Sequence, residues 1–175
     1  GFGDLEYHEN LATRFGSSLA YAPSEYRGAP IDQKNNETQL RFSDGVYAFE
    51  AGALAPGVTI NYLAYTEWAV DAGLKYRGWS FQGEYYQRNM SNFRADGPLP
   101  LDHVFDRGVQ AQVGYMVVPR YLLMYLSGGY LWDQYRRHPW EISPGLSVYP
   151  TTTRSWRINL HTYRIYKSPT GSTFG

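Results

Sequence analysis

The stretch 71–88, DAGLKYRGWSFQGEYYQR, places charged and aromatic residues side by side without an apolar block. On both sides of Gly78 the residue type alternates with a period of two, since Leu74 and Tyr76 interleave with Lys75 and Arg77. Such alternation is typical of a β-strand whose two faces meet different environments. Glycine tolerates the backbone of a tight turn. The stretch therefore predicts a β-hairpin with one apolar and one charged face.

The same alternation recurs along the chain and predicts seven strands. They span residues 10–21, 68–76, 79–88, 109–118, 122–133, 142–149 and 155–167. Their connections alternate in length. The short ones are 76–79, 119–121 and 150–154, and the long ones are 23–66, 92–108 and 135–141. This pattern predicts an all-β, antiparallel up-and-down meander with distinct ends. A long segment is rarely structureless, so we expect 23–66 to fold inward or to form a hairpin.

Composition narrows the classes of protein that fit. The chain has 175 residues, which suits a single domain over 1–175, and 16 basic residues balance 16 acidic ones. A net charge near zero removes the electrostatic argument for nucleic acid as a partner. The absence of cysteine excludes disulfides and thiolate chemistry. The aromatic content of 17% is high, and no apolar run reaches the ~20 residues of a membrane helix.

A meander hides its edge strands most simply by closing into a barrel. In a soluble barrel the apolar face points inward, whereas in a transmembrane barrel it meets lipid. We favour an antiparallel transmembrane β-barrel because the strands are long enough to cross a membrane and aromatic residues mark their ends. The expected lipid-facing aromatic girdle consists of Trp68, Tyr76, Trp79, Tyr85, Tyr130, Trp132, Trp156 and Tyr166.

Two stretches carry a resemblance to a known family. VDAGLKYRGWSFQGEYYQR (70–88) and GPLPLDHVFDRGVQAQVGYMVVPRYL (97–122) resemble bacterial outer-membrane porins of the phosphate-selective porin O and P type. The resemblance implies a barrel of about sixteen strands, often trimeric, that passes small solutes by diffusion. Seven strands would then be the C-terminal half of a longer chain. No ladder of arginines occurs on one strand, so phosphate selectivity is not implied here.

The polar face of such a barrel would line the pore. The expected pore-lining residues are Arg14, Glu67, Asp71, Lys75, Arg77, Glu84, Arg88, Gln110, Gln112, Asp133, Arg157, His161 and Lys167. Six of these are basic and four acidic, which predicts at most a mild preference for anions. The alternative is that the charges pair across neighbouring strands, as Lys75 and Glu84 could.

No catalytic or metal-binding pattern stands out. The four histidines lack metal-ligand spacing, and no nucleophile or phosphate-loop motif occurs, so we expect neither an enzyme nor a cofactor. Asp102, His103 and Asp106 could hold Ca²⁺ or clamp a solute, but we favour a loop anchored by ordinary turn hydrogen bonds. Asp133 with the run Arg136–His138 marks the rim of a long loop and could attract anions or lipopolysaccharide, although a solvated charge run is the simpler interpretation.

The sequence thus predicts an outer-membrane porin, a passive channel for small hydrophilic solutes in the bacterial outer membrane. Its partners would be outer-membrane lipid, lipopolysaccharide and further copies of the chain. Two alternatives stay open. One is a non-porous barrel that anchors another assembly, and the other is a soluble ligand-binding β-barrel.

Overall fold

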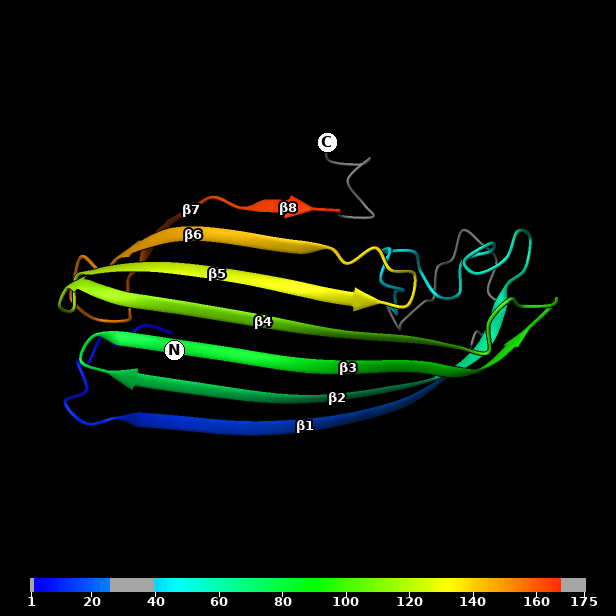
Figure 1. Ribbon diagram of the computed structural model, residues 1–175, viewed down its shortest axis with the longest axis horizontal. Helices are drawn as coiled ribbons and strands as arrows, with labels where there is room; N and C mark the ends of the chain where they lie inside the picture. The colour runs from blue at the N-terminus through cyan, green and yellow to red at the C-terminus, as the bar shows by residue number, and fades with distance from the viewer. Residues whose placement is uncertain (1, 26–39, 168–175) are drawn as a thin grey trace.

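A computed structural model describes residues 2–25 and 40–167, and these form one antiparallel sheet without helices (Figure 1). The strands are β1 (Ala12–Glu25), β2 (Ile60–Tyr76), β3 (Trp79–Ala95), β4 (His103–Val118), β5 (Leu122–Asp133), β6 (Trp140–Val148), β7 (Ile158–His161) and β8 (Arg164–Tyr166). Strands β1 to β7 pair in sequence order, and β8 also pairs with β6. The predicted up-and-down meander is confirmed.

The hairpin predicted at Gly78 forms between β2 and β3. Tyr76 lies opposite Trp79, and Arg77 and Gly78 between them have φ of +45° and +86°. Two consecutive positive φ values are what a two-residue hairpin turn requires, because its twist then matches that of the strands. The backbone N–H of Arg77 also donates to the His8 carbonyl at 2.8 Å. The turn is therefore tied to the N-terminal segment.

Three details differ from the prediction. The strand expected over 155–167 is broken into β7 and β8 at Thr162 and Tyr163, so the sheet has eight strands. Strand β3 continues to Ala95, which shortens the expected loop 92–108. Within the described part of the chain β1 and β7 do not pair with each other, so the sheet is open rather than closed.

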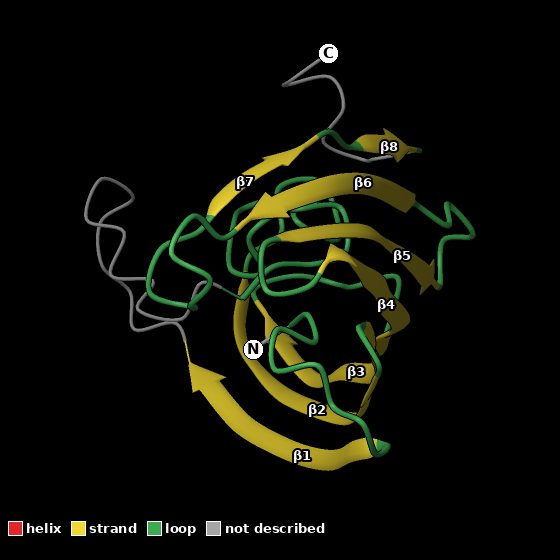
Figure 2. Ribbon diagram, turned by 90° about the vertical axis from the view of Figure 1, so that its left-hand side faces the viewer, coloured by secondary structure: helices red, strands yellow, loops and turns green. Residues whose placement is uncertain are grey.

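The sheet curves into a trough with a concave and a convex face (Figure 2). Successive side chains of a strand point to opposite faces, and the strand register carries each face across the sheet. The row that includes Asp71, Glu84 and Gln110 belongs to the concave face. The row that includes Leu74, Phe81 and Val113 belongs to the convex face.

Two segments without strands cover the ends of the concave face. At the end with short turns, Phe2 and Leu5 pack against Met116, Leu123 and Tyr149. At the opposite end, residues 40–59 pack against β2, β3 and β4, and the buried core there consists of Phe42, Ala48, Phe49, Ile60, Leu63, Met90 and Val104.

The segment 23–66, expected to fold inward or to form a hairpin, has little regular structure between residues 40 and 59. This part contains only the isolated bridge between Arg41 and Tyr47, and residues 60–66 belong to β2. Residues 26–39 of this segment lie outside the described residues.

Candidate functional site: the polar concave face

Between the two covered ends, the concave face is polar and open. At its middle a row of register partners runs from Gly16 on β1 through Asp71, Glu84, Gln110 and Gly129 to Glu141 on β6. We call Asp71, Glu84 and Glu141 the carboxylate row. The neighbouring register row contains Arg14, Gly73, Gln82, Gln112, Ser127 and Ser143.

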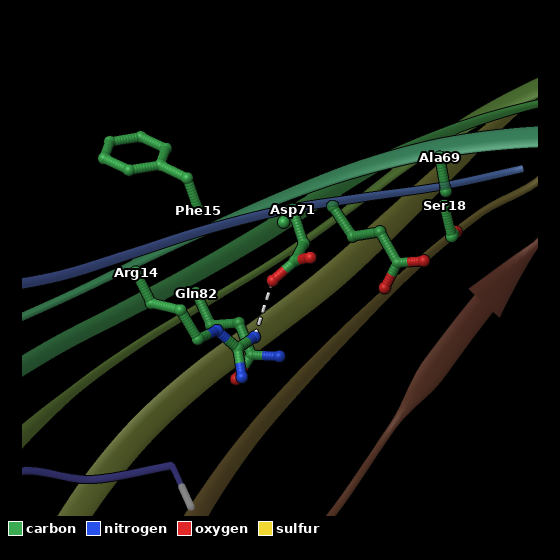
Figure 3. A pocket seen from close by; sticks show the side chains of 8 residues that line it. Arg14, Phe15, Ser18, Ala69, Asp71 and Gln82 are labelled. Carbon is green, nitrogen blue, oxygen red and sulfur yellow. Dashed lines mark hydrogen bonds and ion pairs between the residues drawn. The ribbon is translucent and has the colours of Figure 1, made fainter.

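A groove of about 370 Å³ lies over the β1–β3 part of these rows. Arg14 and Asp71 form an ion pair across it, with Nη2 and Oδ1 2.6 Å apart. Figure 3 shows both side chains and Gln82 on the groove side, whereas Phe15 points to the other face of the sheet. Glu84 completes the polar lining. The groove therefore presents a compensated ion pair beside a second carboxylate.

Glycines of the concave face make room for larger side chains on the neighbouring strands. A Cβ on Gly16 would lie 2.2 Å from Oδ2 of Asp71, so the carboxylate rests directly over this glycine. Likewise a Cβ on Gly108 would lie 2.4 Å from the ring of Tyr86. The same distance separates a Cβ on Gly145 from the ring of Tyr125. Each pair joins register neighbours on adjacent strands, so the backbone provides the space that these side chains occupy.

The end with short turns is fastened by one buried carboxylate. Asp4 has no exposed surface and accepts hydrogen bonds from the backbone N–H of Gly78, at 2.8 Å, and from the backbone and ring of His8. Burial on its own raises the pKa of Asp4. The hydrogen bonds from His8 and Gly78 outweigh it and hold this pKa below its usual value.

The opposite end is fastened by two ion pairs. Arg88 on β3 binds the buried carboxylate of Asp106 on β4 at 2.5 Å and donates to the carbonyl of Arg41 at 3.1 Å. Arg137 binds Asp133 of β5 at 2.5 Å and donates to the Ser43 hydroxyl at 2.9 Å. Asp106 and Asp133 are register partners, so each arginine neutralises one of two adjacent aspartates and reaches residues 41–43.

The convex face carries an apolar band between two aromatic rows. The first row joins Tyr76, Trp79 and Tyr115 as register partners, with the rings of Trp79 and Tyr115 4.8 Å apart. The second row comprises Tyr85, Tyr130, Trp140 and Tyr166, flanked by Trp68 and Trp132. Side chains between them are apolar and exposed, including Leu74, Phe81, Val113 and Leu126. Beyond the second row the face becomes polar, with Gln87 and Arg107 as register partners.

Most of the predicted pore-lining residues share the concave face. The register places Arg14, Glu67, Asp71, Lys75, Glu84, Arg88, Gln110, Gln112, Asp133 and His161 there. Three do not belong to strands, since Arg77 lies in the β2–β3 turn, Arg157 precedes β7 and Lys167 follows β8. Trp156 of the predicted girdle also lies in the connection before β7.

The proposed pairing of Lys75 with Glu84 does not form. Lys75 lies opposite Ser80, and Glu84 lies opposite Asp71. Sequence reasoning also left Glu141, Asp106 and Asp4 out of the site. Alternation in 140–148 places Glu141 on the concave face, and this signal was present. No local signal indicated Asp4, whose partner Gly78 is 74 positions away.

The loop residues considered for Ca²⁺ are held by a simpler contact. Asp102 and His103 form an exposed ion pair of 2.6 Å, and the hydrogen bond from His103 holds the pKa of Asp102 below its usual value. Asp106 instead binds Arg88. Across residues 2–25 and 40–167, no group of three or more acidic or histidine side chains could hold a metal ion.

Comparison of the chain with protein-family models, with curated proteins and with solved structures finds no match.

Proposed function

We propose that the curved sheet is part of an outer-membrane β-barrel porin whose concave face lines a water-filled path for small hydrophilic solutes. The observation that carries this proposal is the contrast between the two faces. The convex face has exposed apolar side chains between two aromatic rows, and the concave face has ion pairs, amides and carboxylates. Lipid outside and water inside would satisfy both.

The dimensions of the convex band support the proposal. Along β2 the girdle residues Trp68 and Tyr76 are eight positions apart. At ~3.3 Å per residue the band is about 26 Å long on this strand, or about 20 Å high for a strand tilted by ~40°, which is of the same order as the ~25 Å apolar belt of a membrane barrel. Indole and phenol rings favour the level of the lipid headgroups, so aromatic rows at both borders fit a membrane-spanning sheet.

The unpaired edge of the sheet also supports the porin proposal. Strand β1 has 14 residues and pairs only with β2 among the described strands, which leaves a long row of backbone groups without sheet partners. In lipid such groups must be paired. The porin proposal therefore includes further strands that complete the barrel. The resemblance to the porin O and P family suggests about sixteen strands and a trimer, with lipopolysaccharide around the rim.

One observation favours a second candidate, a non-porous barrel that anchors a partner in the outer membrane. Residues 2–8 and 40–59 pack onto the two ends of the concave face. If they close the interior, solutes would not pass. Single-channel recording with the full-length protein in planar bilayers separates the two candidates. Discrete conductance steps are expected for the porin, and a silent bilayer with inserted protein would leave the anchor.

The assignment of the two faces can be tested independently of conductance. Residues 1–175 contain no cysteine, so a thiol introduced there is measured against a full-length parent in which any cysteine elsewhere is replaced by serine. The adjacent β4 positions Gln112 and Val113 are matched probes on opposite faces. In the protein inserted into liposomes, Gln112→Cys should react with a charged maleimide and Val113→Cys should not. Equal reaction at both positions would favour a soluble barrel instead.

A further inference from the structure

On the concave face some charged side chains form ion pairs and others do not, and this difference bears on which solutes pass. This inference rests on the proposed porin function. Among the described residues, several arginines at this face are held by carboxylates: Arg14 by Asp71, Arg88 by Asp106 and Arg137 by Asp133. These pairs contribute little net charge to the path.

The carboxylates outnumber these arginines. Among the described residues, neither Glu84 nor Glu141 has a basic group within ion-pair distance, and both side chains are exposed. Glu84 lies directly opposite Asp71 on the neighbouring strand. Like charges at opposed positions of a sheet destabilise it, so this arrangement is unfavourable for the fold alone.

The shape of the wall leaves the carboxylate row accessible. Gly16 lies under Asp71, and Gly129 lies under the side chain of Glu141, whose Oε1 would be 3.7 Å from an added Cβ. The groove beside Glu84 is open and is lined by Arg14, Ser18 and Gln82 as well. A passing ion can therefore approach these carboxylates while it keeps most of its water.

Lys75, another cation of the concave face, lies away from the carboxylate row. Lys75 belongs to the register row of Ser80, Gly114, Tyr125 and His161, nearer the short turns. The charged groups that interact with it electrostatically are Arg154, Glu6 and Asp4 of that end. Lys75 is thus separated from the carboxylate row by the row of Arg14 and Gln82.

From these observations we infer that the path favours small cations over anions, through the field of Glu84 and Glu141 acting on hydrated ions in transit. This reverses the mild anion preference expected from counting charges along the sequence. The difference arises because Arg77, Arg157 and Lys167 lie outside the strands, whereas Glu141 belongs to the wall. The carboxylates act as a selectivity element and not as a binding site for one ion.

The test is the reversal potential of the full-length protein in planar bilayers under a tenfold KCl gradient. The unmodified channel should be more permeable to K⁺ than to Cl⁻. In Glu84→Gln with Glu141→Gln, the permeability ratio should fall by at least about twofold towards unity, because the unpaired charge is removed. Glu84→Lys should move the ratio further, in favour of Cl⁻.

A matched control removes one exposed charge that lies outside the strands. Asp102→Asn changes an exposed carboxylate of the β3–β4 loop and should leave the ratio unchanged. Channels that prefer Cl⁻, or a ratio unaffected by both Glu84 variants, would overturn this inference and leave the porin proposal standing. Inserted protein without any channels would overturn both. Unchanged conductance at high salt shows that the variants fold.

Discussion

The two ends of the concave face are covered by different means. At the end with short turns, a short N-terminal segment is fastened by Asp4, whose carboxylate accepts hydrogen bonds from the backbone N–H groups of Gly78 in the β2–β3 turn and of His8. At the opposite end, residues 40–59 are fastened by the ion pairs of Arg88 and Arg137. The single side chain of Asp4 is enough to fix the short N-terminal segment, because it accepts several backbone hydrogen bonds. The longer segment 40–59 lies beside two neighbouring aspartates, and each of these carboxylates is neutralised by its own arginine.

The largest expected effect comes from breaking an ion pair at the long-loop end. Asp106→Ala leaves Arg88 mostly buried without its partner, and we expect the free energy of unfolding to fall by about 3 kcal/mol. Urea titration followed by tryptophan fluorescence measures this change. The double variant Arg88→Met with Asp106→Leu should lose less, because no charge is left buried. A smaller loss from the single variant than from the double would contradict this account.

Each apolar cluster can be weakened separately. Leu63→Ala and Leu123→Ala remove fully buried side chains from opposite ends, and each should cost about 2–3 kcal/mol. Hydrogen exchange followed by mass spectrometry should show faster exchange in residues 40–59 for Leu63→Ala only. For Leu123→Ala it should be faster in residues 2–8 only. Faster exchange at both ends in either variant would show that the ends are coupled.

A smaller effect is expected from the pH dependence of the Asp4 contact. The folded-state pKa of this carboxyl is lowered, so its contribution to stability is present above the unfolded pKa and is lost as the pH falls through the folded pKa. Asp4→Asn should cost about 1–2 kcal/mol at neutral pH, because hydrogen bonds to a charged acceptor are lost. Protection factors of the amides in residues 2–8, which correct for the slower intrinsic exchange at low pH, should fall between pH 7 and pH 3 in the unmodified protein. Asp4→Asn should show a flatter profile.

The smallest effect is expected between the two ends. Arg14→Gln breaks an ion pair whose arginine side chain is 64% exposed, so the free energy of unfolding should change by less than about 0.5 kcal/mol. Urea titration of this variant and of Asp106→Ala under the same conditions compares the two losses of stability. A loss as large as that of Asp106→Ala would mean that the middle of the wall also holds the fold together.

Much of the fold was predictable because it depends on the local alternation of polar and apolar residues. Period-two patterns place the hairpin at Gly78, and they assign residues such as Asp71 and Leu74 to opposite faces. The break between β7 and β8 was missed, because at Thr162 and Tyr163 polar and aromatic residues continue the alternation through a place where pairing stops.

The candidate site was less predictable, because its charge balance depends on long-range pairs. Whether a carboxylate is neutralised is decided by the register of a neighbouring strand or by a loop, as Asp133 and Ser43 illustrate through Arg137. Counting charges along the strands included Arg77, which the turn removes from the wall, and omitted Glu141. The selectivity that we propose therefore depends on the folded sheet and not on the composition of single strands.

The glycines of the concave face also set the bore of the proposed channel. Tyr86 lies against Gly108 and Tyr125 against Gly145, so both rings occupy recesses in the wall instead of the space in front of it. A single methyl group at either glycine would displace a whole phenol ring. The width of the proposed channel and the charge of its lining thus depend on different residues, so one can be altered while the other is kept.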